Sequence, residues 1–177
     1  MKFVILDRDG TINQDSDQYI KSPEEWKPIK GSMEAIARLT QAGYRLVVAT
    51  NQSGIARGLF DMTTLNAIHD AMHRAVVQAG GRIDAIFFCP HAADSECDCR
   101  KPKPGMLLEI GRRFNVPLEE VHMVGDAARD LQAAATAGAK PVLVLTGKGK
   151  KTQAAGNLPS GTQVFDDLAA FAEHVAP

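Results

Sequence analysis

The three cysteines of the chain stand close together at positions 89, 97 and 99, and His91 lies between the first two. Thiolate and imidazole are ligands that Zn²⁺ prefers, and four protein ligands leave no coordination position for water or substrate. We therefore predict a structural zinc site formed by Cys89, His91, Cys97 and Cys99 in a loop at 89–99. The alternative interpretation is that the cysteines are small buried hydrophobic residues and that His91 is an ordinary surface residue.

Two carboxylates, Asp7 and Asp9, directly follow an apolar run at residues 2–6, and Gly10 allows a sharp turn after them. In an open α/β sheet, ligands bind at the carboxyl ends of the strands. Two carboxylates this close repel each other, and a bound Mg²⁺ relieves the repulsion. Asp7 would then be the nucleophile, and Asp9 would act first as general acid and then as general base. The alternative is a solvated turn rich in Asp and Gly.

Polar residues also follow two further predicted strands. The segment 50–58 begins with Thr50 and Asn51 and contains glycines, so its hydroxyl and backbone amides suit a phosphoryl group. Asp126 adds a third carboxylate after a later strand, and Lys101 offers a fixed positive charge to oxygens shared by metal and nucleophile. Together these residues favour phosphoryl transfer over a set of unrelated polar loops.

Apolar runs alternate with helical periodicity along the chain, which predicts a parallel sheet with helical crossovers. The predicted strands are 2–6, 44–49, 84–88, 121–124 and 141–145, and the predicted helices are 31–42, 63–79, 104–114, 128–137 and 166–174. Gly43 is expected to end the first helix, and Thr63 to cap the second. Residues 148–161 are predicted to form a loop, because Gly, Pro and Lys interrupt every period.

The chain has 177 residues, 45% of them hydrophobic, which suits one compact domain over residues 1–177. We expect a Rossmann-like three-layer α/β sandwich with a mostly parallel central sheet and no large cap domain. The formal net charge of −1 provides no positive electrostatic potential that would attract nucleic acid or an anionic membrane. The basic run at 148–151 is interpreted as a solvated loop.

The location is expected to be the cytoplasm. No stretch approaches the roughly 20 apolar residues of a membrane span. The first residues form a predicted strand rather than a signal peptide. Thiolates that bind a metal also require a reducing compartment.

The order of these motifs resembles that of the haloacid dehalogenase superfamily of phosphotransferases. The matching residues are Asp7-Arg8-Asp9-Gly10-Thr11, Thr50-Asn51, Lys101, Gly125-Asp126 and Asp130. The resemblance implies that Asp7 forms an aspartyl-phosphate, that Asp9 is the acid and base, and that Thr50 and Lys101 hold the phosphoryl group. It also implies that Asp7, the backbone carbonyl of Asp9 and Asp126 hold Mg²⁺, with Asp130 orienting its neighbours.

Within that superfamily, the run 52–58, the cysteine-rich loop and Pro104-Gly105-Met106 are similar to those of heptose bisphosphate phosphatases. This similarity implies removal of the 7-phosphate from a heptose 1,7-bisphosphate, in the synthesis of lipopolysaccharide core precursors. Histidinol-phosphate phosphatases share the same motifs and remain the alternative. The substrate contacts implied by this resemblance are Asp15, Tyr19, Asn51, Gln52, Ser53, Arg57 and Arg100.

One position departs from the pattern. Ala127 stands where related heptose enzymes often carry a basic residue, so Arg100 becomes the candidate for binding the second phosphate. The expected partner is a small sugar bisphosphate bound by a monomer, without nucleic acid or membrane. A polynucleotide-end phosphatase would require a basic groove, and a zinc module that only binds proteins would have no use for Asp7, Asp9 and Asp126 together.

Overall fold

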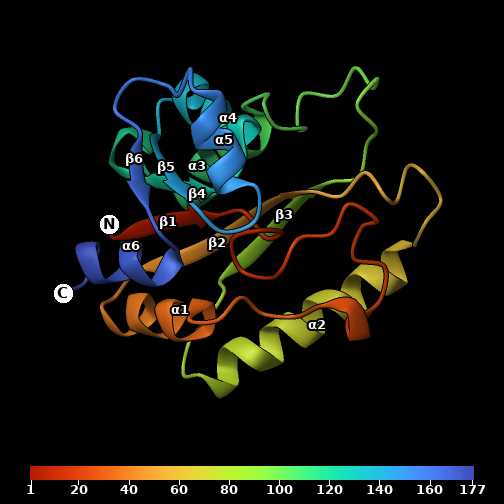
Figure 1. The fold of residues 1–177 in the computed structure, drawn as a ribbon, viewed down its shortest axis with the longest axis horizontal. Helices are drawn as coiled ribbons and strands as arrows, with labels where there is room; N and C mark the ends of the chain where they lie inside the picture. The colour runs from red at the N-terminus through yellow and green to blue at the C-terminus, as the bar shows by residue number, and fades with distance from the viewer.

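A computed structural model describes residues 1–177 and shows one six-stranded sheet with helices on both of its faces (Figure 1). All strand pairs are parallel, and the strand order is β3-β2-β1-β4-β5-β6. The expected Rossmann-like architecture is therefore confirmed, and its sheet is entirely parallel. None of the helices combines the length and apolar character needed to cross a membrane.

The elements follow the predicted alternation of strands and helices. The strands are β1 (Phe3–Leu6), β2 (Arg45–Asn51), β3 (Ala85–Cys89), β4 (His122–Gly125), β5 (Lys140–Val144) and β6 (Gln163–Phe165). The helices are α1 (Ser32–Gln41), α2 (Met62–Gln78), α3 (Gly105–Phe114), α4 (Ala128–Ala137), α5 (Gly149–Ala155) and α6 (Leu168–Val175), with 3₁₀ turns η1 (Pro23–Glu25) and η2 (Leu118–Glu120).

The core has two parts, one on each face of the sheet. Successive side chains of a strand point to opposite faces, so Val4 and Leu6 pack with α1, α2 and α6, whereas Phe3 and Ile5 pack with α3 and α4. Figure 1 shows these two helical layers below and above the sheet. Fully burying each large apolar side chain contributes about 1.5–3 kcal/mol, which makes the sheet a stable base for the loops at its edge.

Two predictions about local structure are wrong. Residues 148–161 are not all loop, because they contain α5. Thr152 on this helix donates hydrogen bonds to the backbone oxygens of Asp126 (2.8 Å) and Lys148 (3.0 Å), so tertiary contacts stabilise a helix that is too short for a clear periodic pattern. The cap of α2 is Asp61 rather than Thr63, and the Asp61 carboxylate accepts from the Thr64 amide at 2.9 Å.

Strand β6 was not predicted from the sequence. It has only three residues and pairs with β5 at the edge of the sheet, where Val142, Leu143 and Val144 face Gln163, Val164 and Phe165. Three residues give too little alternation to identify a strand from its pattern.

The order of strands reverses between β1 and β4, which are neighbours in the centre of the sheet. A crevice forms at such a switch point, outside the carboxyl ends of the strands. Asp7 follows β1 and Asp126 follows β4, so the topology brings two carboxylates that are distant in sequence to this crevice.

Candidate active site

Three buried carboxylates meet at the switch point. The side chains of Asp7, Asp126 and Asp130 each place an oxygen within 4.8 Å of the others. Asp130 reaches the group from the first turn of α4. Gly10 has a φ of +87° and lies so close to the Asp126 carboxylate that any Cβ there would collide with it. The turn after β1 therefore requires glycine for both its conformation and its close approach to Asp126.

Burial makes this group of carboxylates costly to ionise. Desolvation, together with the nearby charges of Asp7 and Asp130, raises the pKa of Asp126 to about 8. Desolvation followed by repulsion from Asp130 raises the pKa of Asp7 to about 6. In addition, the Oδ1 atom of Asp126 is buried without a hydrogen-bond partner. Oxygen donors with uncompensated negative charge fit a hard divalent cation such as Mg²⁺.

Lys101 supplies the positive charge inside the site. Its fully buried Nζ donates to Asp7 Oδ1 at 2.9 Å, to Asp130 Oδ1 at 2.7 Å and to the Ala49 carbonyl at 2.6 Å. Burial opposes the charge on Lys101, but the carboxylates of Asp130 and Asp7 outweigh that effect and raise its pKa. The sequence analysis predicted that Lys101 lies near Asp7, the predicted nucleophile, and the structure brings the two side chains into direct contact.

Asp9 lies in a different environment from Asp7. Its Oδ1 accepts from Arg8 Nε (3.0 Å), Arg8 Nη2 (2.8 Å) and Asn13 Nδ2 (2.9 Å), whereas its Oδ2 accepts only from Gln52 Nε2 (3.1 Å). Burial raises the pKa of Asp9, but the Arg8 charge and the hydrogen bonds from Asn13, Arg8 and Gln52 outweigh it and lower the pKa overall.

Thr50 and Asn51 end β2, and Gln52 directly follows the strand. Gln52 donates to the Thr50 hydroxyl at 2.9 Å as well as to Asp9, so it connects the two. The Asn51 side chain is engaged with the backbone of Lys101, through bonds of 2.9 Å to its carbonyl and 3.0 Å from its amide. Asn51 thus fixes the segment that carries Lys101 and also borders the cavity described next.

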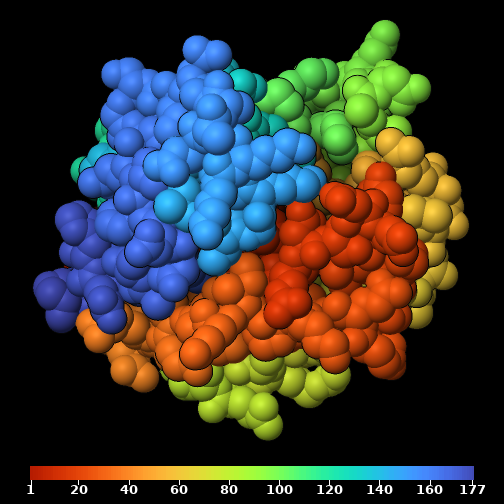
Figure 2. Space-filling model, viewed as in Figure 1, coloured from red at the N-terminus to blue at the C-terminus, as the bar shows by residue number.

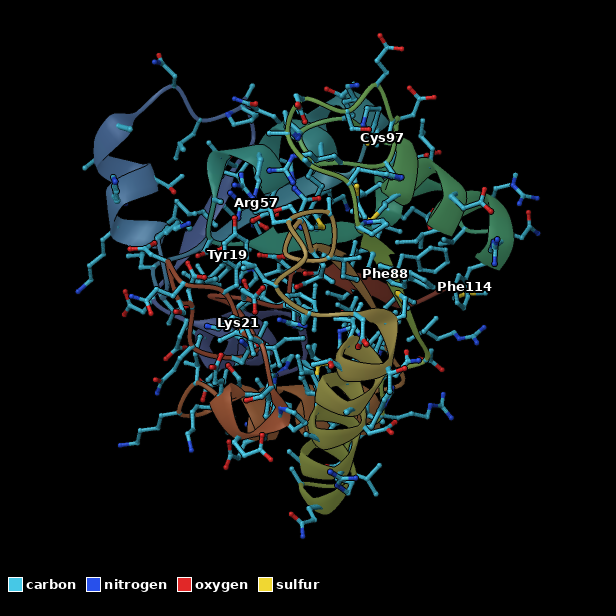
Figure 3. All side chains as sticks on the ribbon, turned by 90° about the vertical axis from the view of Figure 1, so that its right-hand side faces the viewer. Tyr19, Lys21, Arg57, Phe88, Cys97 and Phe114 are labelled. Carbon is cyan, nitrogen blue, oxygen red and sulfur yellow. The ribbon has the colours of Figure 1, made fainter.

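A cavity of about 190 Å³ opens beside Asp9. It is lined by Asp9, Asp15, Ser16, Asp17, Tyr19, Ile20, Asn51, Gln52, Ser53, Arg100, Arg129 and Lys148. Every predicted substrate contact except Arg57 is in this lining. The exposed Arg57 instead lies over the Tyr19 ring, with its Cζ 5.9 Å from the ring centre (Figure 3). A second hollow of about 500 Å³ adjoins it where the N-terminal segment, red in Figure 2, meets the light-blue segment near Lys148.

Sequence reasoning missed two cations of this lining, Arg129 and Lys148. Lys148 was interpreted as part of a solvated loop, but its backbone amide donates to Asp126 Oδ2 at 2.8 Å and its Nζ lies 3.5 Å from Asp15 Oδ2. Arg129 directly precedes Asp130 in the first turn of α4. Its closeness in sequence to the expected metal ligand Asp126 could have identified it as a candidate site residue.

Cys89 ends β3, and the loop after this strand brings the other three predicted zinc ligands close to it. His91 Nδ1 lies 3.4 Å from Cys89 Sγ and 3.3 Å from Cys99 Sγ, and Cys89 Sγ lies 3.8 Å from Cys97 Sγ. Bonds of about 2.3 Å from sulfur to a tetrahedral zinc ion place two sulfurs about 3.8 Å apart. The donor set and spacing therefore fit Zn²⁺, and Cys97 is seen on this loop in Figure 3.

Comparison with known proteins adds three findings. A family model described as HAD-hyrolase-like matches residues 98–171. The D-glycero-beta-D-manno-heptose-1,7-bisphosphate 7-phosphatase of Bordetella bronchiseptica is 63% identical over 99% of this chain and 98% of its own, and the protein of that name from Neisseria meningitidis is 56% identical over 99% and 95%.

Comparison with solved structures finds similarity to phosphatases of the same kind. The D,D-heptose 1,7-bisphosphate phosphatase of B. bronchiseptica in complex with magnesium and phosphate superposes with a TM-score of 0.98 and covers 99% of this chain and 98% of its own. The corresponding phosphatase from Burkholderia thailandensis is 55% identical, with a TM-score of 0.80 over 99% of this chain and 98% of its own.

Proposed function

This chain belongs to the family of D-glycero-beta-D-manno-heptose-1,7-bisphosphate 7-phosphatases within the HAD-like hydrolases, and on that premise we propose that it removes the 7-phosphate of a heptose 1,7-bisphosphate. The observation that carries the proposal is the group of three buried carboxylates in contact with Lys101, next to a cavity that is lined by cationic side chains. The product would enter the synthesis of lipopolysaccharide core precursors.

In the first step, a carboxylate oxygen of Asp7 attacks the phosphorus atom while the bond to the sugar oxygen breaks. Asp9 gives its proton to that leaving oxygen, and an aspartyl-phosphate remains on Asp7. In the second step, Asp9 takes a proton from the water that attacks the phosphorus, which releases inorganic phosphate and restores Asp7. Phosphoryl transfer of this kind depends mainly on positioning and charge stabilisation.

The remaining residues of the site hold the phosphoryl group. Lys101 is fixed by Asp130 and Asp7, so its charge is already oriented toward the transferring oxygens. The Thr50 hydroxyl, at the end of β2, would donate a hydrogen bond to the phosphoryl group. Asp7, the Asp9 carbonyl and Asp126 would hold Mg²⁺, which when bound neutralises the charge of the phosphate and the carboxylates. Asp126 Oδ1, buried without a partner, supports this assignment.

The second phosphate of the substrate would bind to the cations of the cavity. Arg100 and Arg129 both line it, and a guanidinium can grip a phosphate with two hydrogen bonds. Arg129 sits two positions after Ala127 and provides the positive charge that Ala127 lacks. Histidinol phosphate has no second phosphate, so these cations favour the heptose bisphosphate over that alternative.

The cysteine loop would hold a structural Zn²⁺ through Cys89, His91, Cys97 and Cys99, because these four ligands fill a tetrahedral ion. A reducing compartment, the cytoplasm, suits such thiolates. We further propose that residues 1–177 act as one domain, since a single continuous sheet runs through them, and that the protein is a monomer.

The test is phosphate release from a panel of substrates: heptose 1,7-bisphosphate, fructose 1,6-bisphosphate and histidinol phosphate, each with Mg²⁺. We expect the highest kcat/KM for the heptose bisphosphate, and ³¹P NMR of the product should show that the 1-phosphate remains. A higher kcat/KM for histidinol phosphate would contradict the assignment and favour the alternative.

A further inference from the structure

Arg8 lies between Asp7 and Asp9 in sequence and is completely buried. Two of its nitrogens, Nε and Nη2, donate to Asp9 Oδ1, and the third, Nη1, lies 3.1 Å from Nε2 of His69. A guanidinium has donors only, so His69 Nε2 must be the acceptor and the ring must carry its proton on Nδ1. The proposed mechanism gives no role to either Arg8 or His69.

His69 lies on α2, a helix that is packed against the hydrophobic core. Its neighbours Leu65, Ile68 and Met72 on that helix are fully buried in the core, and His69 itself is only 7% exposed. Burial, followed by the charge of Arg8, lowers the pKa of His69 to about 3. The ring therefore stays neutral near pH 7 and keeps its acceptor available to Arg8.

The hydrogen bonds to Asp9 are unevenly divided between its two oxygens. Oδ1 receives three donors, two from Arg8 and one from Asn13, whereas Oδ2 receives only Gln52. The oxygen with fewer donors is the one free to give a proton to a leaving group and later to take one from water. The orientation of Arg8 thus decides which oxygen of Asp9 is available for the reaction.

We propose that His69 is a positioning residue that acts through Arg8: from the core helix α2 it holds the guanidinium so that Asp9 keeps Oδ2 directed to the leaving oxygen. This inference rests on the proposed phosphatase function. Without the acceptor on His69, Arg8 Nη1 loses a buried partner and the guanidinium is free to turn toward other acceptors. Asp9 would then be misaligned as a proton donor, although Asp7 and Lys101 would be unchanged.

A role in proton donation affects substrates unequally. An alkyl phosphate such as β-glycerophosphate has a poor leaving group that needs a proton from Asp9, whereas p-nitrophenyl phosphate releases a stable anion that does not. The ratio kcat/KM reports the steps up to phosphoryl transfer to Asp7, before water attacks. A purely structural defect would lower kcat/KM for both substrates by the same factor.

The experiment compares three purified, folded variants with the parent protein. His69→Leu removes the acceptor, His69→Gln places an amide oxygen near the position of Nε2, and His73→Leu is a control one turn further along α2. We expect His69→Leu to lower kcat/KM about tenfold for β-glycerophosphate and less than about twofold for p-nitrophenyl phosphate. His69→Gln should recover most of the loss, and His73→Leu should match the parent.

Equal losses for both substrates, or a His69→Leu variant with parental kinetics, would overturn the inference while leaving the proposed function intact. Absence of phosphate release by the parent protein would instead refute the proposed function itself. If circular dichroism shows that His69→Leu does not fold, His69→Asn, whose side chain is too short to reach Arg8, is judged by the same two substrates.

Discussion

Asp7 and Asp9 are two residues apart, yet their environments shift their pKa values in opposite directions. Burial and the Asp130 charge raise the pKa of Asp7, and the Arg8 charge with several hydrogen bonds lowers that of Asp9 despite its burial. Asp9 is therefore ionised in the free protein. A phosphate bound beside it brings negative charge, which raises the pKa of Asp9 and favours the proton that a general acid needs.

Asp7→Asn should lose phosphatase activity by several powers of ten, because an amide is not a nucleophile for phosphorus. The fold should remain, since Asp7 lies at the edge of the sheet, outside the apolar core. Phosphate release and circular dichroism would measure the two effects. Turnover within about tenfold of the parent would contradict the assignment of Asp7 as nucleophile.

Arg100→Ala and Arg129→Ala should each raise KM for a bisphosphate and leave a monophosphate ester nearly unchanged. The selective loss should be roughly 1.5–3 kcal/mol, the usual contribution of a hydrogen bond to a charged group. Lys101→Ala is the matched comparison: it should lower kcat for both substrates, because Lys101 contacts Asp7. If the arginine variants damage both substrates equally, the cations serve the general phosphoryl site and do not recognise the second phosphate.

At the scale of elements, the loop at 89–99 links the end of β3 to the residues that face the cavity. Cys99 directly precedes Arg100 and Lys101, and Arg100 Nη1 donates to the His91 carbonyl at 3.4 Å. The conformation of this loop therefore determines the positions of the Arg100 and Lys101 side chains. The short helix α5 has a similar role at the proposed Mg²⁺ site, since the Thr152 hydroxyl donates to the Asp126 backbone carbonyl.

Cys97→Ser should weaken zinc binding, and with it both thermal stability and substrate affinity. Zinc affinity contributes directly to the folding of a loop that its ligands order. Zinc content by elemental analysis, the melting temperature and KM would be measured together, with Asp94→Ser in the same exposed loop as the control. Parental stability and KM in a zinc-depleted Cys97→Ser protein would show that the loop is ordered by other contacts.

At the scale of the whole molecule, the buried carboxylates couple the stability of the fold to Mg²⁺ and pH. A carboxyl group whose pKa is raised by folding binds a proton more tightly in the folded protein than in the unfolded chain. Its unfavourable effect on stability is therefore greatest at high pH and is relieved as the pH falls through the folded pKa. Asp126, with a pKa of about 8, is the main group of this kind between pH 6.5 and 8.5.

The metal-free protein should accordingly become more stable as the pH is lowered from 8.5 to 6.5, and Mg²⁺ should stabilise it most at the upper end. Chelation of Mg²⁺ should abolish activity, and Mg²⁺ addition should restore it. Urea unfolding with and without Mg²⁺ would measure the effect, with Asp126→Asn as the control that lacks both the pH dependence and most of the Mg²⁺ stabilisation. A parental response in Asp126→Asn would place the cation elsewhere.

The sequence by itself determined the features that lie within short segments or repeat along the chain. The four predicted zinc ligands fall within residues 89–99, and Asp7 and Asp9 directly follow an apolar strand, so each group is close together in the chain itself. The regular alternation of strands and helices predicted the parallel sheet, because burial of both faces imposes long apolar runs. The ends of parallel strands share one edge, which placed Thr50 and Asp126 near Asp7.

Only the tertiary structure decided the contacts between segments that are far apart. Arg8 contacts His69, which lies 61 positions away in the sequence. The Lys148 amide donates to Asp126, 22 positions away, from a segment whose helix α5 is too short to show helical periodicity in the sequence. The position of the Arg129 side chain in the cavity lining likewise depends on how α4 is oriented against β4. The physical reason is that local patterns record which face of an element is buried, whereas the direction of each polar side chain depends on which neighbours the packed sheet brings within hydrogen-bond distance.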